Sequence, residues 1–427
     1  MARDSHAGGL TVRVWIDVVT VFSIRPIAPS MAVATRIREV LVAVNQSRSR
    51  LLGTVAAGWF LVLGMRFVIP AILPTIRTEY AISNATAGVA VTILWLAYAG
   101  MQFPTGVFID RVGERVLLVG SMLLSALGLL AYSFAPVFSL FLVATVVFGL
   151  GTGLYGPTRG TVLSRCFADR EGVAFGTVLA AGSAGAALLP FLAALAIGSV
   201  GWRIALAGAA PIFLVVAIGL WWIVPARPTA RTDRSLLPDL RASVAGFRDR
   251  RLLLAVAGAT LMLFGFQGVT AFLTTYLFEQ KGLSQGLAGG LLSLLFVGGA
   301  LAQTTTGALA DRYGTPRVLA GVAFVSVVPL VALPLLSGPV ALGVASFVIG
   351  FRMSSGPLSN AYIVDVLPDD VEGTAWGLLR TSFFVVGSFG SVLVGLMADW
   401  NVFDGAFYLL AGLTALAGLI YLVLPER

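Results

Sequence analysis

Four arginines lie inside long apolar stretches of this 427-residue sequence, where a charge is costly to place: Arg66, Arg159, Arg352 and Arg380. One such charge at the centre of a lipid bilayer costs about 2.5–3.5 kcal/mol on insertion scales. The acidic residues that come closest fall at the ends of apolar stretches, so none is comparably deep. Deep guanidinium groups without deep carboxylates require another anion, and a bound ligand would supply it. The sequence therefore predicts an anion-binding site inside a membrane.

These arginines are expected at different depths. At a rise of about 1.5 Å per residue, Arg66 and Arg352 approach the middle of their stretches, whereas Arg380 lies about 10 Å from one end. Arg380 could therefore reach the membrane surface or belong to a gate. Arg159 follows the letters YGPT near the end of its stretch, and we expect it to pair there with an acid such as Asp110. We expect the other three in a substrate site, with Arg66 foremost and a structural role as the alternative.

Polar and aromatic side chains accompany the arginines. Trp95, Tyr98 and Gln102 follow helical spacing and share one face of a helix. Gln267 and Gln303 stand in two later stretches. We predict that all five contact substrate, with hydrogen bonding between helices as the alternative.

Composition places these stretches in a membrane protein. The sequence is 58% hydrophobic and 11% charged, with a mean hydropathy of +0.94. Apolar runs of about 20 residues, the length that crosses a bilayer, recur throughout. Cys166 and His6 are the only residues of their types, which excludes metal sites built from cysteine and histidine. Because no nucleophile–base pair or phosphate-binding loop is recognisable, we expect no enzyme activity, no metal and no cofactor.

The apolar stretches number twelve, in two groups of six. They predict an all-α polytopic membrane protein with twelve transmembrane helices in two pseudo-symmetric six-helix halves. The expected domains are a cytoplasmic tail that suits an amphipathic helix (1–50), an N-terminal half (51–224), a cytoplasmic linker (225–251) and a C-terminal half (252–427). The predicted spans are 52–75, 87–109, 115–134, 138–161, 173–198, 203–224, 252–277, 287–310, 316–336, 339–362, 374–398 and 403–424.

The distribution of arginine predicts the orientation of these helices. Arginines concentrate in the tail, in the linker and in loops on the same side, whereas the opposite loops carry little more than Arg77, Arg203 and Lys281. Because cytoplasmic loops are enriched in basic residues, both termini are expected in the cytoplasm. This placement explains the net charge of +8 without nucleic acid. The near-absence of lysine suits a prokaryotic genome, so we expect a prokaryotic plasma membrane.

The two halves repeat one another at an offset of 201 residues. The segment GVFIDRVGER follows the second stretch and begins at Gly106, and GALADRYGTPR follows the eighth and begins at Gly307. The same offset relates EGVAFG to EGTAWG, which begin at Glu171 and Glu372. Several matches at equivalent ends of spans indicate two parallel repeats, the arrangement expected of a transporter with its site between the halves.

The segment GVFIDRVGER resembles the loop signature of the major facilitator superfamily: glycine, three residues, Asp-Arg, any residue, glycine, any residue and arginine. The degenerate second copy is also typical of that superfamily. The resemblance implies the major facilitator fold and alternating access to a central site. It further implies a cytoplasmic gate in which Asp110 faces the N-terminus of the eleventh helix, whose partial positive charge favours a carboxylate. The predicted gate residues are Gly106, Asp110, Arg111, Gly113, Arg115, Arg159, Glu171, Gly307, Asp311, Arg312, Gly314, Arg317 and Glu372.

Within that superfamily, RFVIPAILPTIRTEYAIS and LWLAYAGMQFPTGVFIDRVG look most like two anion-handling branches, the anion:cation symporters and the organophosphate antiporters. Members of these branches carry a first-span arginine that contacts anionic substrate, and Arg66 is the matching position. The chain departs from the first branch at Met65 and Thr152, where acids are frequent. It departs from the second at Gln267, where a second arginine is expected.

The sequence therefore predicts a secondary active transporter of a small organic anion, either a carboxylate or a phosphate ester. The expected partners are the substrate, a coupling ion (proton or sodium) and the lipid bilayer, and the expected state is a monomer. The alternative is a multidrug or metabolite exporter of the same superfamily, although Thr145 stands where exporters usually carry an arginine and AGSAGAALLP lacks their Gly-Pro signature. A receptor that does not transport ranks third, and an enzyme last.

Overall fold

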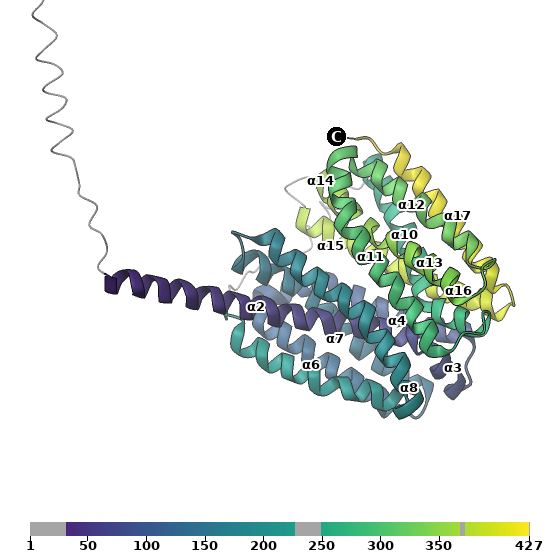
Figure 1. Cartoon of the computed structure of the whole chain (residues 1–427), viewed down its shortest axis with the longest axis horizontal. Helices are drawn as coiled ribbons and strands as arrows, with labels where there is room; N and C mark the ends of the chain where they lie inside the picture. Colours follow the sequence, from purple (N-terminus) through teal and green to yellow (C-terminus); the bar gives the residue numbers. More distant parts are fainter. Residues whose placement is uncertain (1–30, 227–248, 368–371, 427) are drawn as a thin grey trace, which may run out of the picture. The chain divides into compact units, whose positions relative to one another are not determined.

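The computed structural model describes residues 31–226, 249–367 and 372–426. Side chains are described from residue 46 onward, except at 372–376. Throughout these ranges the secondary structure is helical, with short turns between helices (Figure 1).

The chain separates into two compact units, Met1–Ser49 and Arg50–Arg427. In the first unit, residues 31–49 are α-helical and belong to α2, which runs from Met31 to Ala71. Whether this tail helix lies on a membrane surface stays a prediction. Residues 1–30 lie outside the described residues.

By the N-terminal half we mean the described residues 50–226. Seven helices lie wholly or partly within it. They are α2 (Met31–Ala71), α3 (Leu73–Tyr80), α4 (Asn84–Gly100), α5 (Gln102–Val112), α6 (Glu114–Ser133), α7 (Phe138–Cys166) and α8 (Glu171–Ile223). The C-terminal half, residues 249–426 as far as described, contains α10 (Arg250–Glu279), α11 (Gln285–Tyr313), α12 (Thr315–Ala332), α13 (Pro339–Ile349), the 3-10 helix η2 (Gly350–Ser354), α14 (Ser355–Val366), α15 (Glu372–Ser388), α16 (Gly390–Asp399) and α17 (Phe403–Val423).

These helices make twelve membrane passages within the described ranges. Ten helices are long and apolar enough to cross a membrane, and the bent pair of α4 and α5 supplies another passage. α8 is 53 residues long, and the non-helical backbone of Gly201, with φ of 75°, divides it into two passages. The predicted all-α polytopic membrane fold is therefore confirmed, with six passages before the linker and six after it.

Two breaks interrupt passages that carry predicted site residues. α4 and α5 meet at Met101 with a bend of 41°. In the tenth passage, η2 separates α13 from α14, and a Cβ on Gly350 would lie 1.9 Å from the carbonyl oxygen of Leu295. Glycine is required for this approach of η2 to α11. Non-helical backbone at membrane depth occurs where it is buried in protein or lines a cavity, and η2 carries Arg352.

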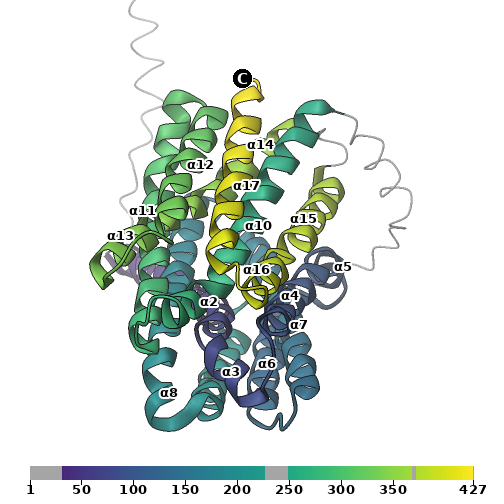
Figure 2. The same ribbon diagram turned by 90° about the vertical axis from the view of Figure 1, so that its right-hand side faces the viewer.

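The two halves meet at one end of the Arg50–Arg427 unit. We call this end, which holds the turns at 81–83, 280–284 and 400–402, the far side; the linker side is the opposite end, with the turns at Gly113 and Gly314. Towards the far side, α4 packs against α16, and α8 packs against α11 (Figure 2). One hydrophobic core cluster contains residues of both halves.

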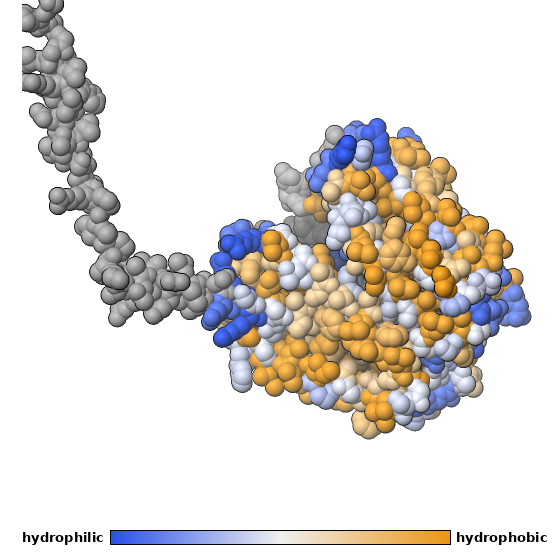
Figure 3. Space-filling model, in the orientation of Figure 1, coloured by the Kyte–Doolittle hydropathy of each residue, from blue (hydrophilic) through white to orange (hydrophobic). Residues whose placement is uncertain are grey.

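The outer surface is apolar across both halves. Large hydrophobic side chains such as Trp222 and Val340 are about 80% exposed, and orange residues cover the faces of the helices in Figure 3 while blue residues gather at their ends. An apolar surface of this extent marks contact with a membrane or another protein.

Candidate functional site

Arg66 on α2 is enclosed by aromatic side chains. Its guanidinium carbon lies 4.3 Å from the ring centre of Tyr98, 5.1 Å from that of Trp95 and 5.3 Å from that of Trp59. Its Nε donates to the carbonyl oxygen of Val62 at 3.3 Å. Only 1% of the residue is exposed, and Nη2 has no hydrogen-bond partner within the described part of the chain.

The aromatic rings offset only part of the cost of burying this charge. Cation–π contacts contribute about 0.5–2 kcal/mol, whereas a buried charge needs a counter-charge and hydrogen bonds to all of its donors. None of the carboxylates that the structure describes forms an ion pair with Arg66. The unused donor is therefore suited to an anionic ligand.

Two further arginines lie beside Arg66. Arg159 on α7 places its guanidinium carbon 4.0 Å from the ring centre of Trp59, and its Nε and Nη1 lack partners among the described residues. Arg380 on α15, from the opposite half, also has an unpartnered Nε. The guanidinium carbon of Arg380 lies 5.9 Å from the ring centre of Phe384, and Phe384 contacts the rings of Trp95 and Tyr98 beside Arg66. We call Arg66, Arg159 and Arg380 the arginine cluster.

Arg159 makes contacts that differ from the expected pairing with Asp110. α7 continues to Cys166, beyond the predicted end at 161, so Arg159 lies deeper than expected and reaches Trp59. Asp110, its expected partner, is exposed and makes no ion pair with a described side chain. Arg159 therefore lies beside Arg66, over the same Trp59 ring, and its role in the gate stays a prediction.

Aromatic rings connect the halves around the cluster. Phe384 on α15 stacks on Trp95 at a centroid distance of 6.2 Å and lies 5.4 Å from the ring of Tyr98. Phe67, next to Arg66, packs 4.4 Å from Phe296 and 6.1 Å from Phe266, both in the C-terminal half. The arginine cluster thus lies where the two halves meet.

Arg352 occupies a separate place in the C-terminal half. Its Nη2 donates to the carbonyl oxygen of Met262 at 3.0 Å and to Thr414 Oγ1 at 3.4 Å. Gly265 makes room for it, because a Cβ there would lie 2.4 Å from Nη2. Arg352 and Arg380 both line a cavity of about 180 Å³.

The three predicted glutamines differ in what they contact. Gln102 Nε2 donates to the carbonyl oxygens of Tyr98 at 3.3 Å and Gly153 at 3.5 Å, and Gln303 Nε2 donates to that of Met353 at 3.4 Å. Gln267 is fully buried, and neither atom of its amide has a partner in the described ranges. The first two therefore connect helices, while Gln267 has unused hydrogen-bonding capacity.

The turns of the repeated loop have the same backbone geometry in both halves. Gly113, between α5 and α6, has φ of 82°, and Gly314, between α11 and α12, has φ of 86°. Both values lie in the region that side chains rarely adopt. The Asp-Arg pairs of the two loops are exposed, and so are the glycines that begin the loops: Asp110, Arg111, Asp311, Arg312, Gly106 and Gly307.

The other predicted gate residues make contacts near the linker side. Arg115 lies over the ring of Trp221 at 4.6 Å, Glu171 accepts a hydrogen bond from Ser164, and Arg317 pairs with Glu426 at 2.7 Å. The side chain of Glu372 lies outside the described residues. The gate in which Asp110 faces the eleventh helix stays a prediction.

Comparison with known proteins identifies the family to which this chain belongs. A model of the Major Facilitator Superfamily matches residues 55–390 and, in a second match, residues 287–427. The chain belongs to the major facilitator superfamily. The fosmidomycin resistance protein of Escherichia coli is 24% identical over 390 residues, covering 88% of this chain and 93% of that protein. The gentisate transporter of Corynebacterium glutamicum is 26% identical over 395 residues and 86% of each chain.

A solved structure of the nucleoside transporter NupG has the same fold. It superimposes with a TM-score of 0.76 at 15% identity and covers 89% of this chain and all of that one. The protein is therefore a multi-pass membrane transporter of the major facilitator superfamily that handles a small-molecule substrate.

Sequence reasoning missed several contacts that join the two halves on the far side. Arg77 on α3 forms an ion pair with Glu279 on α10 and donates to Asn84 Oδ1 at 2.6 Å. Asp399 accepts the backbone N–H groups of Asn84 and Ala85, each at 2.8 Å, at the N-terminus of α4. The available signal was that Arg77 is a rare base among the far-side loops. We call these contacts the far-side latch.

A second missed residue is Glu114 in the loop signature. It is 1% exposed and pairs with Arg165 on α7 at 2.8 Å. The equivalent position in the repeat is Thr315, so this buried ion pair belongs to the N-terminal half alone.

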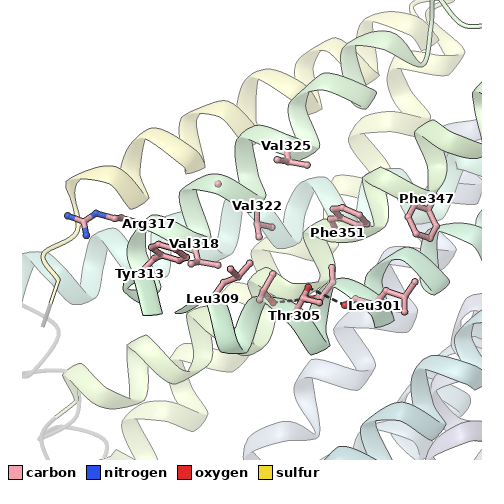
Figure 4. Close-up of a pocket in the computed structure, with 13 residues that line it drawn as sticks. Leu301, Thr305, Leu309, Tyr313, Arg317, Val318, Val322, Val325, Phe347 and Phe351 are labelled. Atoms are coloured by element: carbon pink, nitrogen blue, oxygen red, sulfur yellow. Dashed lines mark hydrogen bonds between the residues drawn. The ribbon is translucent and has the colours of Figure 1, made fainter. Parts of the chain in front are cut away.

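The transporter also has a larger groove on its outer surface. Its volume is about 580 Å³, and it lies between α11, α12 and the region of η2. Figure 4 shows mostly apolar side chains along it, with Tyr313 and Arg317 at one end and Phe347 at the other, while Thr305 bonds to the backbone of Leu301. Because its charged group, Arg317, is already paired with Glu426, the groove lacks the unmet charge that distinguishes the arginine cluster.

Proposed function

We propose that this transporter carries a small organic anion, a carboxylate or a phosphate ester, by alternating access. The observation that carries the proposal is the arginine cluster. Three guanidinium groups from α2, α7 and α15 gather around connected aromatic rings, where like charges repel one another, and they retain unused donors. A bound anion would offset that repulsion and accept the free N–H groups, and arginine suits a planar carboxylate or a phosphate.

The aromatic rings around the cluster support a substrate with an organic body. Trp59, Trp95, Tyr98 and Phe384 present flat apolar faces beside the charges. Ligand sites typically combine such faces with a few well-placed polar groups. The names of the two relatives agree with this class, since gentisate is an aromatic carboxylate and fosmidomycin a phosphonate.

A second candidate function is export of drugs or metabolites. The specific observation in its favour is the relative named for fosmidomycin resistance. Export and uptake use the same alternating-access cycle, so the direction is decided by coupling, and we propose a proton or sodium ion as the coupled ion. The proposed functional unit is a monomer.

We further propose that the linker side faces the cytoplasm of a prokaryotic cell. The arginine-rich tail and linker support this orientation. The far-side latch then closes the outer end of the site, and access from the cytoplasm would run between the halves on the linker side. In the proposed cycle the latch opens and the gate around Asp110 closes against α15. The corresponding domains are the tail (1–50), the halves (51–224 and 252–427) and the linker (225–251).

A thermal-shift screen of the purified full-length protein tests the charge class of the substrate. Ligand binding stabilises the folded state by RT ln(1 + [L]/Kd), which is about 2.7 kcal/mol at a hundredfold excess over Kd. We expect organic anions to raise the melting temperature, and lipophilic cations and neutral solutes to leave it unchanged.

Two variants make the screen specific to the site. Arg66→Gln should abolish the shift that anions produce, because it removes the central guanidinium group. Arg251→Gln removes an equal charge from an exposed position at the start of α10 and should keep the shift. Stabilisation by cations alone, or an anion shift that survives Arg66→Gln, would overturn the proposal.

A further inference from the structure

The C-terminal half contains a second buried arginine with unused hydrogen-bond donors. Arg352 is 1% exposed, and only its Nη2 is bonded, whereas Nε and Nη1 have no partner among the residues that the structure describes. Nη2 alone makes the contacts with Met262 on α10 and Thr414 on α17. A purely connecting role would therefore use only this one nitrogen of the guanidinium group. The two remaining donors therefore require another acceptor.

These donors belong to a side chain that lines a cavity. The cavity has a volume of about 180 Å³ and includes Arg352, Arg380, Asn360 and Ser355 in its lining. Whole-ligand pockets usually measure about 300–1,000 Å³, so this cavity can hold one polar group of a ligand and not an entire organic molecule. No carboxylate lines it in the described part of the chain.

The cavity is connected to the arginine cluster through two shared residues. Arg380 lines the cavity and also belongs to the cluster around Arg66. Phe384 lines the cavity and stacks on Trp95, which contacts Arg66. A molecule lying along the face of Phe384 would therefore have an arginine of the protein near each of its two ends.

We propose that the Arg352 cavity receives a second anionic group, so that the preferred substrates are organic dianions with a negative group at each end of an apolar body. This inference rests on the proposed anion transport and narrows its substrate class. One anionic group would bind at Arg66 and Arg159, the other at Arg352, with Arg380 between them. Two negative charges also balance the four arginines better than one does.

Matched ligands separate the second charge from shape and size. Terephthalate, isophthalate and adipate are each compared with the corresponding monomethyl ester, which keeps the body and removes one charge. Binding is measured by calorimetry on the purified full-length protein. A hydrogen bond to a charged group contributes enough for about tenfold to a hundredfold in affinity, and we expect at least one diacid to bind more tightly than its monoester by about that factor.

The variant Arg352→Gln tests the cavity itself. It should reduce the affinity of the preferred diacid to that of its monoester and leave monoester binding unchanged. Arg251→Gln is the control and should keep the wild-type ratio. A purely structural role for Arg352 would instead lower the affinity for both ligands equally and leave their ratio intact, which would overturn the inference.

The outcomes also separate this inference from the proposed function. If monoesters bind as tightly as every diacid, the dianion inference is wrong and anion transport stands. If neither these carboxylates, benzoate included, nor the phosphate ester phenyl phosphate binds to the wild-type protein, the proposed function itself fails. If diacids bind preferentially but Arg352→Gln keeps that preference, the cavity is not the second site.

Discussion

The two halves of the transporter share a scaffold but differ in their chemistry. At the repeated loop, Gly113 and Gly314 adopt nearly the same positive φ angle. At the equivalent position inside the first and seventh passages, the N-terminal half has Arg66 and the C-terminal half has Gln267. Both side chains are buried, and both retain unpartnered polar atoms within the described residues. The two halves thus repeat the backbone turn, which needs glycine, whereas the buried polar residue at the equivalent helix position differs between them.

The surroundings of these two positions explain which half carries the charge. Arg66 has three aromatic rings within 5.3 Å of its guanidinium carbon, contributed by Trp59, Trp95 and Tyr98. Such rings attract a cation through their negative faces. The C-terminal half contributes its charge from other passages, through Arg352 and Arg380. The buried arginines are therefore arranged asymmetrically in a pseudo-symmetric fold.

The largest expected effect comes from exchanging the two equivalent residues. In Arg66→Gln with Gln267→Arg, the total charge is unchanged but the cation leaves its aromatic surroundings. We expect anion affinity to fall about a hundredfold or more, as it should in Arg66→Gln alone, because a hydrogen-bonded charge contributes about 1.5–3 kcal/mol and its unmet partner adds to the loss. Calorimetry with the tightest anion measures this. Recovery of affinity in the exchanged chain would show that the halves are interchangeable.

The next effect concerns ion pairs at the linker side of each half. Glu114→Gln leaves Arg165 without its buried partner, and because Arg165 is about a third exposed we expect a loss of about 1–3 kcal/mol of stability. Glu426→Gln breaks the more exposed pair with Arg317 and should cost about 0–1 kcal/mol. Thermal melting of the two variants shows which one loses more stability. An equal loss of stability in both would contradict the argument from burial.

The shared loop geometry predicts a loss of stability in both halves, with an added contact to Glu426 at Gly314. Gly113→Ala and Gly314→Ala force a side chain into a positive φ region at a cost of about 1–3 kcal/mol. The control substitutions Gly106→Ala and Gly307→Ala lie on exposed helical positions with no atom within 4 Å of the new Cβ, and should be neutral or slightly stabilising. If only one of the two variants, Gly113→Ala or Gly314→Ala, lowered the melting temperature, the result would contradict the structural repeat.

The smallest expected effect tests the contact that joins the halves on the far side. Glu279→Gln removes the partner of Arg77, and for a partly exposed pair worth about 1 kcal/mol the open state should rise about fivefold. Maleimide labelling of Ala71→Cys, in a Cys166→Ser background, reports this opening because Ala71 is fully buried in the core shared by the halves. Glu79→Gln is the control, since Glu79 pairs with Arg203 within one half. Equal labelling in both variants would reject the latch.

Much of the fold follows from local sequence. Apolar stretches of membrane length predict the twelve passages, and the repeated glycines mark turns that only glycine accommodates. Arg66 stands out because a charge within such a stretch is rare. The tertiary contacts could not be read in this way. Arg159 reaches Trp59 because α7 continues to Cys166, and a helix end is hard to locate by composition alone.

Contacts between distant segments were equally inaccessible. Arg380 meets the cluster, and Arg77 meets Glu279, through packing of one half on the other. The 3-10 break at Gly350 depends on the approach of Leu295 from α11. Nothing in the local pattern of residues specifies such partners, because they are set by which helices become neighbours.

Counterflow exchange in proteoliposomes tests the central claim most directly. Vesicles containing purified protein are loaded with the tightest-binding unlabelled anion, and entry of the radiolabelled anion is followed. The account predicts rapid exchange for the wild type and for Arg251→Gln, and exchange at the level of empty vesicles for Arg66→Gln. Exchange by Arg66→Gln at the wild-type rate would show that the buried arginine cluster does not receive the transported anion.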